Sequence, residues 1–348
     1  MNKLDSIIEK AFSRRKFIAG AGGLAAATVV TGLTGCGSSK SITPTPTPPN
    51  TTFTDLDVLN FALNLEYLEA QFYLYAATGN GLSATDTAAP SGYAGSYKQG
   101  TVTVGSGTAV PGLTSEQQDI VNEIAYEEQE HVRFLRTALG AAAVPMPSID
   151  LSFFGPLAVA AGITGPTFNP FSSFDAFLVG AFIFEDVGVT AYAGAAPLIS
   201  AAGVASGYLS AAAGILAVEA YHAAYVRTAI TGSAIAAGSA TAYPYITAAN
   251  QVAALRAMLT VGNSGAPDSA TGNTGAAGSS SSVETSLVLP GSQTIASSIV
   301  AADPAHALGF ARNVNQVHHI VYGSGKVGVA KGGFFPNGTN SIFATTTA

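Results

Sequence analysis

Two segments of the chain carry a glutamate followed three residues later by a histidine. Glu128 and His131 form the first pair, and Glu219 and His222 form the second. At about 100° per helical residue, each pair falls on the same side as neighbouring aliphatic residues, so both pairs are predicted to face a core. A carboxylate or an imidazole buried there without a partner is costly, and a bound metal cation removes this cost. The residue types and their spacing therefore predict metal ligands.

Two single glutamates, each followed seven residues later by a tyrosine, extend the pattern to two other segments. Glu66 precedes Tyr73, and Glu185 precedes Tyr192. Seven residues make about two helical turns, so each tyrosine is predicted to lie on the same face as its glutamate. Carboxylates can bridge two divalent ions, one histidine per ion supplies a nitrogen ligand, and iron or manganese suits such a set. The predicted ligands of the two transition-metal ions are Glu66, Glu128, His131, Glu185, Glu219 and His222.

Three further side chains are candidates for catalysis at such a centre. Glu69 competes with Glu66 as the ligand of its segment, and we favour Glu66 because Gly188 takes the place of Glu69 in the matching segment. Glu69 is then a proton donor or an alternative ligand. Tyr73 and Tyr192 are either core tyrosines with a bonded hydroxyl group or participants in redox chemistry. A metal-free network of hydrogen bonds is the alternative, and the double repeat argues against it.

Four long helices are predicted to position these residues. Thr54 and Asp57 fit a capping box at the start of the first helix, and Thr114 and Ser115 mark the start of the second. Residues 141–171 contain several prolines and no helical period, which indicates a long crossover between the second and third helices. The fold class is therefore all-α, a four-helix bundle with an extra helix. The predicted helices span about residues 54–77, 114–140, 173–196, 204–231 and 248–261.

The remaining segments are rich in loops. Residues 79–112 form a long loop, with a short hairpin predicted at Thr101–Val104, and loops of this length are usually functional or disordered. Residues 262–285 are a low-complexity stretch of Gly, Ser and Ala. A helical piece is predicted at Asp303–Tyr322. The paired phenylalanines within Gly332–Gly338 indicate a turn-rich segment docked on the bundle.

Residues 1–36 have the features of a targeting segment. Ser13–Ile18 resembles the twin-arginine export consensus, and a Gly/Ala-rich apolar stretch follows it. Leu33–Cys36 resembles a bacterial lipobox, in which the cysteine is lipidated and becomes the mature N-terminus. Residues 37–52, with their Thr-Pro repeats, are an extended tether. The sequence thus predicts an exported lipoprotein on the periplasmic face, held to the membrane through lipidated Cys36.

The composition of the chain limits the kinds of partner that it is expected to bind. The formal net charge is −7, and no basic patch follows the N-terminal segment, which argues against a nucleic-acid partner. Charged residues make up only 10% of the chain and hydrophobic residues 48%, as expected for long helices with wide buried faces. The single cysteine excludes an internal disulfide. A small oxidant, peroxide or dioxygen, is the expected substrate, and the oligomeric state is left open.

Other charged residues have plainer interpretations. Arg136 and Arg227 lie near helix ends, where arginines usually meet surface acids or the last carbonyl groups. His306, His318 and His319 have no matching carboxylate pattern and are expected to be structural or exposed. The remaining acids of the second helix are expected to form a solvated face. They are Glu116, Asp119, Glu123, Glu127 and Glu130.

Several segments together resemble a known family. The chain is similar to bacterial ferritin-like domain proteins related to plant desiccation-related proteins, over most of residues 53–342 and at all six predicted ligand positions. The resemblance implies a four-helix bundle with a long crossover. It implies little about the reaction, because few members have an assigned activity. The segments are Asn64–Tyr73, Glu128–Val132, Phe184–Gly188, Leu216–His222, Gln316–Gly323 and Gly332–Gly338.

These observations lead to one hypothesis and its alternatives. Residues 53–232 are predicted to form the ferritin-like bundle, and residues 233–348 an extension packed on it. The bundle is predicted to hold a di-iron or di-manganese centre that acts on peroxide or dioxygen in oxidative or desiccation stress. The alternatives are a metal-binding stress protein without turnover and a structural envelope protein.

Overall fold

The computed structural model divides the chain into two units, Met1–Pro48 and Pro49–Ala348. The predictions for the signal segment and the tether lie outside the residues that the structure describes, as does most of the low-complexity stretch. All described residues belong to the second unit. They are residues 53–105, 107–163, 168–261, 284–288, 299–302 and 307–346.

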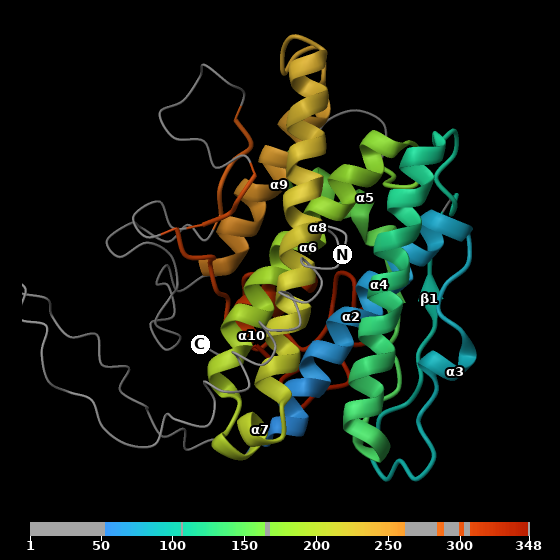
Figure 1. Ribbon diagram of the computed structural model, residues 1–348, viewed down its shortest axis with the longest axis vertical. Helices are drawn as coiled ribbons and strands as arrows, with labels where there is room; N and C mark the ends of the chain where they lie inside the picture. The colour runs from blue at the N-terminus through green and yellow to red at the C-terminus, as the bar shows by residue number, and fades with distance from the viewer. Residues whose placement is uncertain are drawn as a thin grey trace, which may run out of the picture. The chain divides into compact units, whose positions relative to one another are not determined.

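Four long helices, α2, α4, α6 and α8, form the body of this unit (Figure 1). The helix α2 packs most extensively against α4, and α6 against α8, so the unit is built from two helical hairpins. A long crossover joins α4 to α6. The predicted all-α bundle with a crossover between its second and third helices is confirmed. The helix bounds are Asp55–Thr78 for α2, Ser115–Leu139 for α4, Phe174–Ala195 for α6 and Tyr208–Ala236 for α8.

The first two helices start where their capping residues predict. The Thr54 backbone N–H donates to the Asp57 carboxylate over 2.7 Å, which closes the capping box of α2. Thr114 caps α4, and its hydroxyl oxygen accepts from the Gln117 N–H over 3.2 Å. The helix α2 ends at Gly79, whose φ of 76° is in the left-handed region that favours glycine. Local capping chemistry therefore determines these boundaries.

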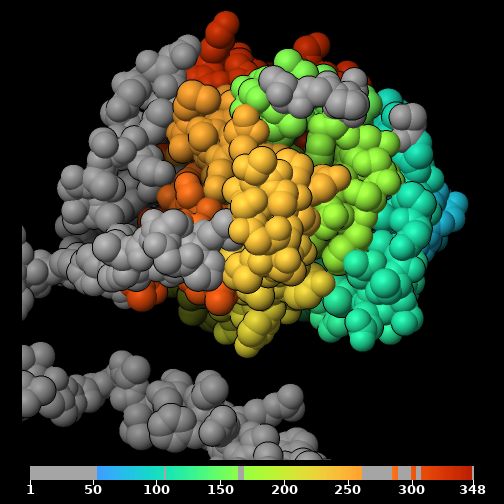
Figure 2. All heavy atoms as spheres, turned by 90° about the horizontal axis from the view of Figure 1, so that it is seen from above, coloured from blue at the N-terminus to red at the C-terminus, as the bar shows by residue number. Residues whose placement is uncertain are grey.

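The predicted fourth helix is two helices in the structure. A short helix, α7 (Ala201–Ala205), ends before Gly207, and α8 then continues to Ala236. Gly207 has a φ of 86°, so the chain changes direction there at a residue without a Cβ atom. The helix α9 (Pro244–Val261) follows and lies beside the C-terminal part of α8 (Figures 1 and 2). It starts earlier than predicted, at a proline, which suits the first turn of a helix.

The predicted hairpin at Thr101–Val104 is wrong. Strand β1 (Val102–Thr103) instead pairs in parallel with β2 (Ile149–Asp150), with Val102 opposite Ile149. The partner strand comes from the crossover, so the pairing depends on packing between distant segments and leaves no local turn signal. The short helical elements of the loop and the crossover are α3 (Ala84–Thr87), η1 (Gly140–Ala142), η2 (Leu151–Phe153) and α5 (Phe154–Ala160), and η3 (Ala196–Leu198) follows α6.

The C-terminal extension contributes one short helix and a buried pair of phenylalanines. The helix α10 (Val314–Val321) is shorter than the predicted Asp303–Tyr322, because Asn313 caps it with a side chain that accepts from the Gln316 N–H. Phe334 and Phe335 are fully buried. The Phe334 ring packs 4.9 Å from that of Phe154 and 5.0 Å from that of Phe184, so this segment contributes directly to the core around α6.

Candidate metal centre

The six predicted ligand residues lie together in the buried core of the bundle. Each of the four long helices contributes: α2 and α6 supply one glutamate each, and α4 and α8 supply a glutamate and a histidine each. Their ligand atoms form two overlapping groups, and within each group all atoms lie within 4.8 Å of one another. Glu128 belongs to both groups. The first group is Glu66, Glu128, His131 and Glu219, and the second is Glu128, Glu185 and His222.

The first group surrounds the Nδ1 atom of His131. This nitrogen lies 3.2 Å from Glu66 Oε2, 3.5 Å from Glu128 Oε2 and 3.7 Å from Glu219 Oε1. The three carboxylates come from three different helices. An imidazole nitrogen and several carboxylate oxygens at this spacing are a donor set suited to a divalent transition metal.

The second group surrounds the Nδ1 atom of His222. This nitrogen lies 3.1 Å from Glu128 Oε1 and 3.5 Å from Glu185 Oε2. Because the two oxygens of Glu128 face different histidines, this carboxylate can contact two cations at once. The two groups of ligand atoms are therefore neighbours that share one residue.

The ligand atoms are buried, and most of them have no hydrogen-bond partner among the described residues. Among the described residues, no hydrogen-bond partner exists for the Nδ1 atoms of His131 and His222, for either oxygen of Glu128 and Glu219, or for Oε2 of Glu66 and Glu185. Leaving so many buried polar atoms unpaired is costly. A cation in each group would supply the missing partner, so the residues present fit a pair of metal ions.

The two predicted tyrosines connect the hairpins to each other. The Tyr73 hydroxyl on α2 donates to Glu185 Oε1 on α6, and the Tyr192 hydroxyl on α6 donates to Glu66 Oε1 on α2. Each tyrosine therefore bonds the glutamate of the opposite helix rather than the one on its own. Burial raises the pKa of both phenols well above the usual value, so both remain donors at neutral pH.

Glu69 is buried beside the ligands but belongs to neither group. A Cβ atom at Gly188 would lie 2.2 Å from Glu219 Oε2 and 3.2 Å from Glu69 Oε1, so the missing side chain of Gly188 makes room for both carboxylates. Burial, and then the neighbouring Glu128, raise the pKa of Glu69 well above its usual value. The geometry thus places Glu66 among the ligand atoms and leaves Glu69 beside them.

Charge within the cluster is distributed unevenly. Burial alone would lower the histidine pKa values, but the carboxylates outweigh it and raise the pKa of His131 to about 11 and that of His222 to about 12. Burial raises the pKa of Glu66 to about 7. Burial would also raise the pKa of Glu128, but the two neighbouring imidazoles, of His131 and His222, hold it at about 2. The shared ligand is therefore the most acidic of these groups.

Glu127 contacts His222, and the sequence did not predict this contact. The sequence predicts Glu127 on the solvated face of the second helix, but its Oε2 atom lies 2.6 Å from His222 Nε2 and only 35% of its side chain is exposed. Glu116, Asp119 and Glu123 are exposed as predicted. No local signal marks Glu127, because its partner is on α8 and the contact depends on how α4 and α8 are placed.

The two arginines of the repeat bind the residues that follow the ligand glutamates. Arg136 Nη1 donates to the Tyr67 hydroxyl over 2.6 Å, and Arg227 Nη1 donates to Asp186 Oδ2 over 2.7 Å. Asp186 is buried, which differs from the predicted surface acid. Tyr67 follows Glu66 as Asp186 follows Glu185. Each arginine thus binds the side chain of the residue that directly follows a ligand glutamate.

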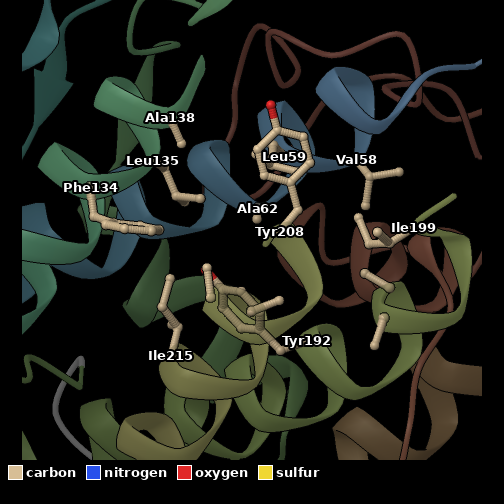
Figure 3. A pocket seen from close by; sticks show the side chains of 14 residues that line it. Val58, Leu59, Ala62, Phe134, Leu135, Ala138, Tyr192, Ile199, Tyr208 and Ile215 are labelled. Carbon is tan, nitrogen blue, oxygen red and sulfur yellow. The ribbon is translucent and has the colours of Figure 1, made fainter. Parts of the chain in front are cut away.

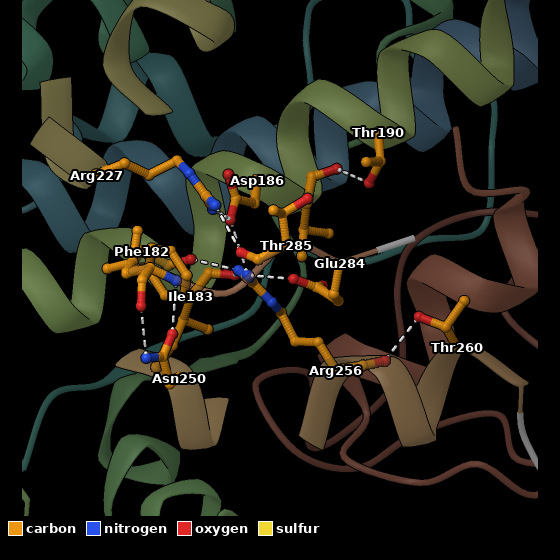
Figure 4. Close-up of polar contacts among 12 residues, drawn as sticks. Phe182, Ile183, Asp186, Thr190, Arg227, Asn250, Arg256, Thr260, Glu284 and Thr285 are labelled. Atoms are coloured by element: carbon orange, nitrogen blue, oxygen red, sulfur yellow. Dashed lines mark hydrogen bonds and ion pairs between the residues drawn. The ribbon is translucent and has the colours of Figure 1, made fainter. Parts of the chain in front are cut away.

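Asp186 and Arg227 belong to a larger buried network that holds the C-terminal extension against the bundle (Figure 4). Arg256 Nη2 on α9 lies 2.8 Å from Asp186 Oδ2 and 2.7 Å from Glu284 Oε2. Glu284 also pairs with Arg312, whose Nη1 atom donates to Thr190 on α6. Charged groups from α6, α8, α9 and two later segments therefore meet in one network, which includes Asp186, the residue after Glu185.

Two of the three remaining histidines are buried in α10. His318 Nε2 lies 3.2 Å from Thr339 Oγ1, its ring stacks on Tyr322, and burial lowers its pKa to about 3. His319 Nδ1 lies 3.2 Å from the Leu259 carbonyl oxygen. Both are buried, and neither belongs to the two groups of ligand atoms. His306 lies outside the described residues.

An apolar pocket opens at one end of the bundle, beside the cluster (Figure 3). All four long helices line it, including Leu59 on α2, Leu135 on α4 and Ile215 on α8. Tyr192 is part of its wall, and the same tyrosine donates to Glu66. The space open to the centres of water-sized molecules is about 30 Å³, enough for about two such molecules.

The fold and the cluster define a helical bundle with a carboxylate–histidine metal site, and a comparison with known families agrees. The sequence model of the ferritin-like domain family matches residues 54–232 of this chain. This is more than half of the chain, so the chain belongs to the ferritin-like domain family, and the predicted resemblance is confirmed.

Two characterised relatives extend this comparison. The chain is 26% identical over 298 residues to the ferritin-like catalase Nec2 of Nesocodon mauritianus, a match that covers 83% of this chain and 85% of the relative. It is 33% identical over 177 residues to the desiccation-related protein PCC13-62 of Craterostigma plantagineum. That match covers 50% of this chain and 52% of the relative.

Proposed function

We propose that the chain binds two ions of iron or manganese in the bundle core and uses them to act on peroxide or dioxygen. The supporting observation is the set of buried ligand atoms without hydrogen-bond partners, contributed by all four long helices. The positive charge of two divalent ions balances the negative charge of four ionised carboxylates. Once bound, such ions supply Lewis acidity, redox equivalents and open coordination positions. The four carboxylates are Glu66, Glu128, Glu185 and Glu219.

Glu69 is the proton donor in this proposal. It is the fifth buried glutamate at the cluster, so two divalent ions balance the charge of the other four and leave Glu69 protonated. Its raised pKa, which burial and then Glu128 cause, supports the same state. A neutral carboxylic acid beside the ligands can donate a proton to a substrate oxygen and recover one afterwards.

Tyr73 and Tyr192 orient the ligands. Each donates to one oxygen of a ligand glutamate and leaves the other oxygen facing the cluster. Partners of this kind keep a ligand in position and tune its basicity. Tyr192 also lies in the wall of the apolar pocket, so this pocket is the proposed approach to the cluster.

The relatives and the N-terminal sequence support two further parts of the proposal. The name of the Nec2 relative, a catalase, favours peroxide as the substrate. The twin-arginine pattern at Ser13–Ile18 and the lipobox ending at Cys36 favour export and a lipid anchor on the periplasmic face. Twin-arginine export moves folded cargo, so the metal can be loaded before export.

The test combines metal analysis with turnover. The purified full chain, loaded with Fe²⁺ or Mn²⁺, should hold two ions and consume hydrogen peroxide, measured by loss of peroxide and release of dioxygen. Glu69→Gln should keep both ions and lose most of the turnover, while Glu123→Gln on the exposed face should behave as wild type. A chain that holds no metal, or consumes peroxide equally well after Glu128→Ala, would contradict the proposal.

The alternative is a metal-binding stress protein without turnover. The 33% identity to a desiccation-related protein favours it. Under this alternative, the loaded chain holds two ions but does not consume peroxide, and removal of the metal lowers only its thermal stability. A third possibility, a purely structural protein, predicts no bound metal at all.

A further inference from the structure

The two histidines of the cluster are supported differently on the side that faces away from the ligands. His222 Nε2 lies 2.6 Å from the Glu127 carboxylate, while its Nδ1 atom faces Glu128 and Glu185. Glu127 directly precedes Glu128 on α4. In the matching segment of α8, Val218 directly precedes Glu219. The repeat therefore offers a carboxylate to His222 and an aliphatic side chain at the corresponding position of the other hairpin.

The carboxylates are distributed in the opposite sense. The group around His131 contains Glu66, Glu128 and Glu219, whereas the group around His222 contains only Glu128 and Glu185. One cation position thus has three carboxylates, and the other has two carboxylates and a histidine with a carboxylate behind it. The tyrosines do not create this difference, because each group has one.

The chemistry of such a pair is well defined. When Nδ1 of a histidine binds a metal, Nε2 carries the proton, and this N–H donates a hydrogen bond to a carboxylate within reach. This contact selects the tautomer, holds the ring in place and makes the imidazole a stronger ligand. Because 35% of the Glu127 side chain is exposed and the His222 side chain is almost buried, the contact lies at the edge of the core.

We infer that Glu127 is a positioning residue that selectively strengthens the metal position built around His222 and partly offsets its smaller number of carboxylates. The inference rests on the proposed binding of two ions. It adds that the two positions are chemically unequal and that one residue outside the ligand set controls one of them.

The test is a titration of the metal-free full chain with Mn²⁺, followed by calorimetry and electron paramagnetic resonance. Glu127→Gln should bind the first ion as the wild type does and the second about 10–100-fold more weakly, the range found for such supporting residues. At two equivalents, the wild type should show the signal of a coupled manganese pair. The variant should show mainly a single-ion signal, which returns to the pair signal at higher Mn²⁺.

Glu123→Gln is the matched control, because it removes the same charge from an exposed position one turn earlier on α4. It should leave both affinities and the pair signal unchanged. Metal-free Glu127→Gln should keep the helical content of the wild type by circular dichroism, which separates a local effect on His222 from a general loss of structure.

Two results would overturn the inference while leaving metal binding intact. One is that Glu127→Gln binds both ions with wild-type affinity. The other is that Glu127→Gln and Glu123→Gln lower the affinity for both ions to the same extent. A wild-type chain that binds no Mn²⁺ or Fe²⁺ would overturn the proposed function itself, and the inference with it.

Discussion

The two helical hairpins of the bundle, α2–α4 and α6–α8, carry the same ligands but different surroundings. In each hairpin, one helix contributes a glutamate and the other a glutamate and a histidine, and a tyrosine bonds the opposite hairpin. The matched pairs are Glu66 and Glu185, Glu128 and Glu219, His131 and His222, and Tyr73 and Tyr192.

The differences lie just outside these shared residues. The first hairpin carries Glu69 and Glu127, where the second has Gly188 and Val218. The arginines differ as well, because Arg136 meets a tyrosine and the carbonyl groups of a nearby loop, whereas Arg227 enters the buried ionic network. The shared residues build one cluster, and both the unequal grouping of its carboxylates and the unshared residues make its two halves chemically unequal.

The largest expected effect comes from the ligand that both halves share. Glu128→Ala should remove both ions, because Glu128 belongs to both groups, and affinity should fall by more than about 100-fold, the upper range for mere supporting residues. Glu185→Ala should weaken only the position around His222. Elemental analysis of the two variants checks this. Equal loss of metal in both would contradict two distinguishable positions.

The second prediction compares the two arginine contacts. Asp186→Asn removes the charge that Arg227 and Arg256 share in a buried network, so the free energy of unfolding should fall by about 3–5 kcal/mol. Tyr67→Phe removes the hydrogen bond from the partly exposed Arg136 and the one to the Val144 carbonyl oxygen, but no charge, and should cost less, about 1.5–3 kcal/mol. Urea unfolding of both variants measures the difference. A larger loss for Tyr67→Phe would contradict the ionic role of the second hairpin.

A substitution at Gly188 tests whether this glycine leaves the space that Glu219 and Glu69 need. Gly188→Ala places a Cβ atom 2.2 Å from Glu219 Oε2, so the carboxylate must shift, with a cost of about 1–3 kcal/mol and weaker metal binding. Gly214→Ala is the control, since a Cβ atom there meets nothing within 4 Å. It should stabilise α8 by about 0.5–1 kcal/mol. Thermal unfolding and metal titration of both variants decide the matter.

The dependence of metal binding on pH follows from the histidine pKa values. Because these are about 11 for His131 and about 12 for His222, both rings hold protons in the metal-free protein at neutral pH. A metal must displace them, so affinity should rise with pH, by about tenfold per unit for each proton released. Calorimetry in buffers of different ionisation enthalpy counts the protons between pH 6 and 8. An affinity independent of pH would contradict the assignment of these histidines.

Much of the cluster could be predicted because its signals are local. Helical periodicity places Glu128 with His131, and Glu219 with His222, on buried faces, and Thr54 and Thr114 mark helix starts through capping residues. These features need only a few neighbouring residues. The comparison of the two halves of the sequence then predicted the common centre.

The rest depends on contacts between distant segments. The pairing of Val102 with Ile149, the contact of Glu127 with His222 and the position of Glu284 between two arginines arise only when the helices pack. The break at Gly207 has a local cause, but one glycine in an apolar stretch is compatible with a continuous helix as well. Periodicity therefore identifies the ligands better than it identifies their supports.

The most direct test of the central claim is the ratio of metal to chain. The purified full chain, after loading with Fe²⁺ or Mn²⁺ and removal of loosely bound ions, should contain two ions per chain by elemental analysis and show magnetic coupling between them. A chain that retains no metal, or retains ions without any coupling, would contradict the dinuclear centre.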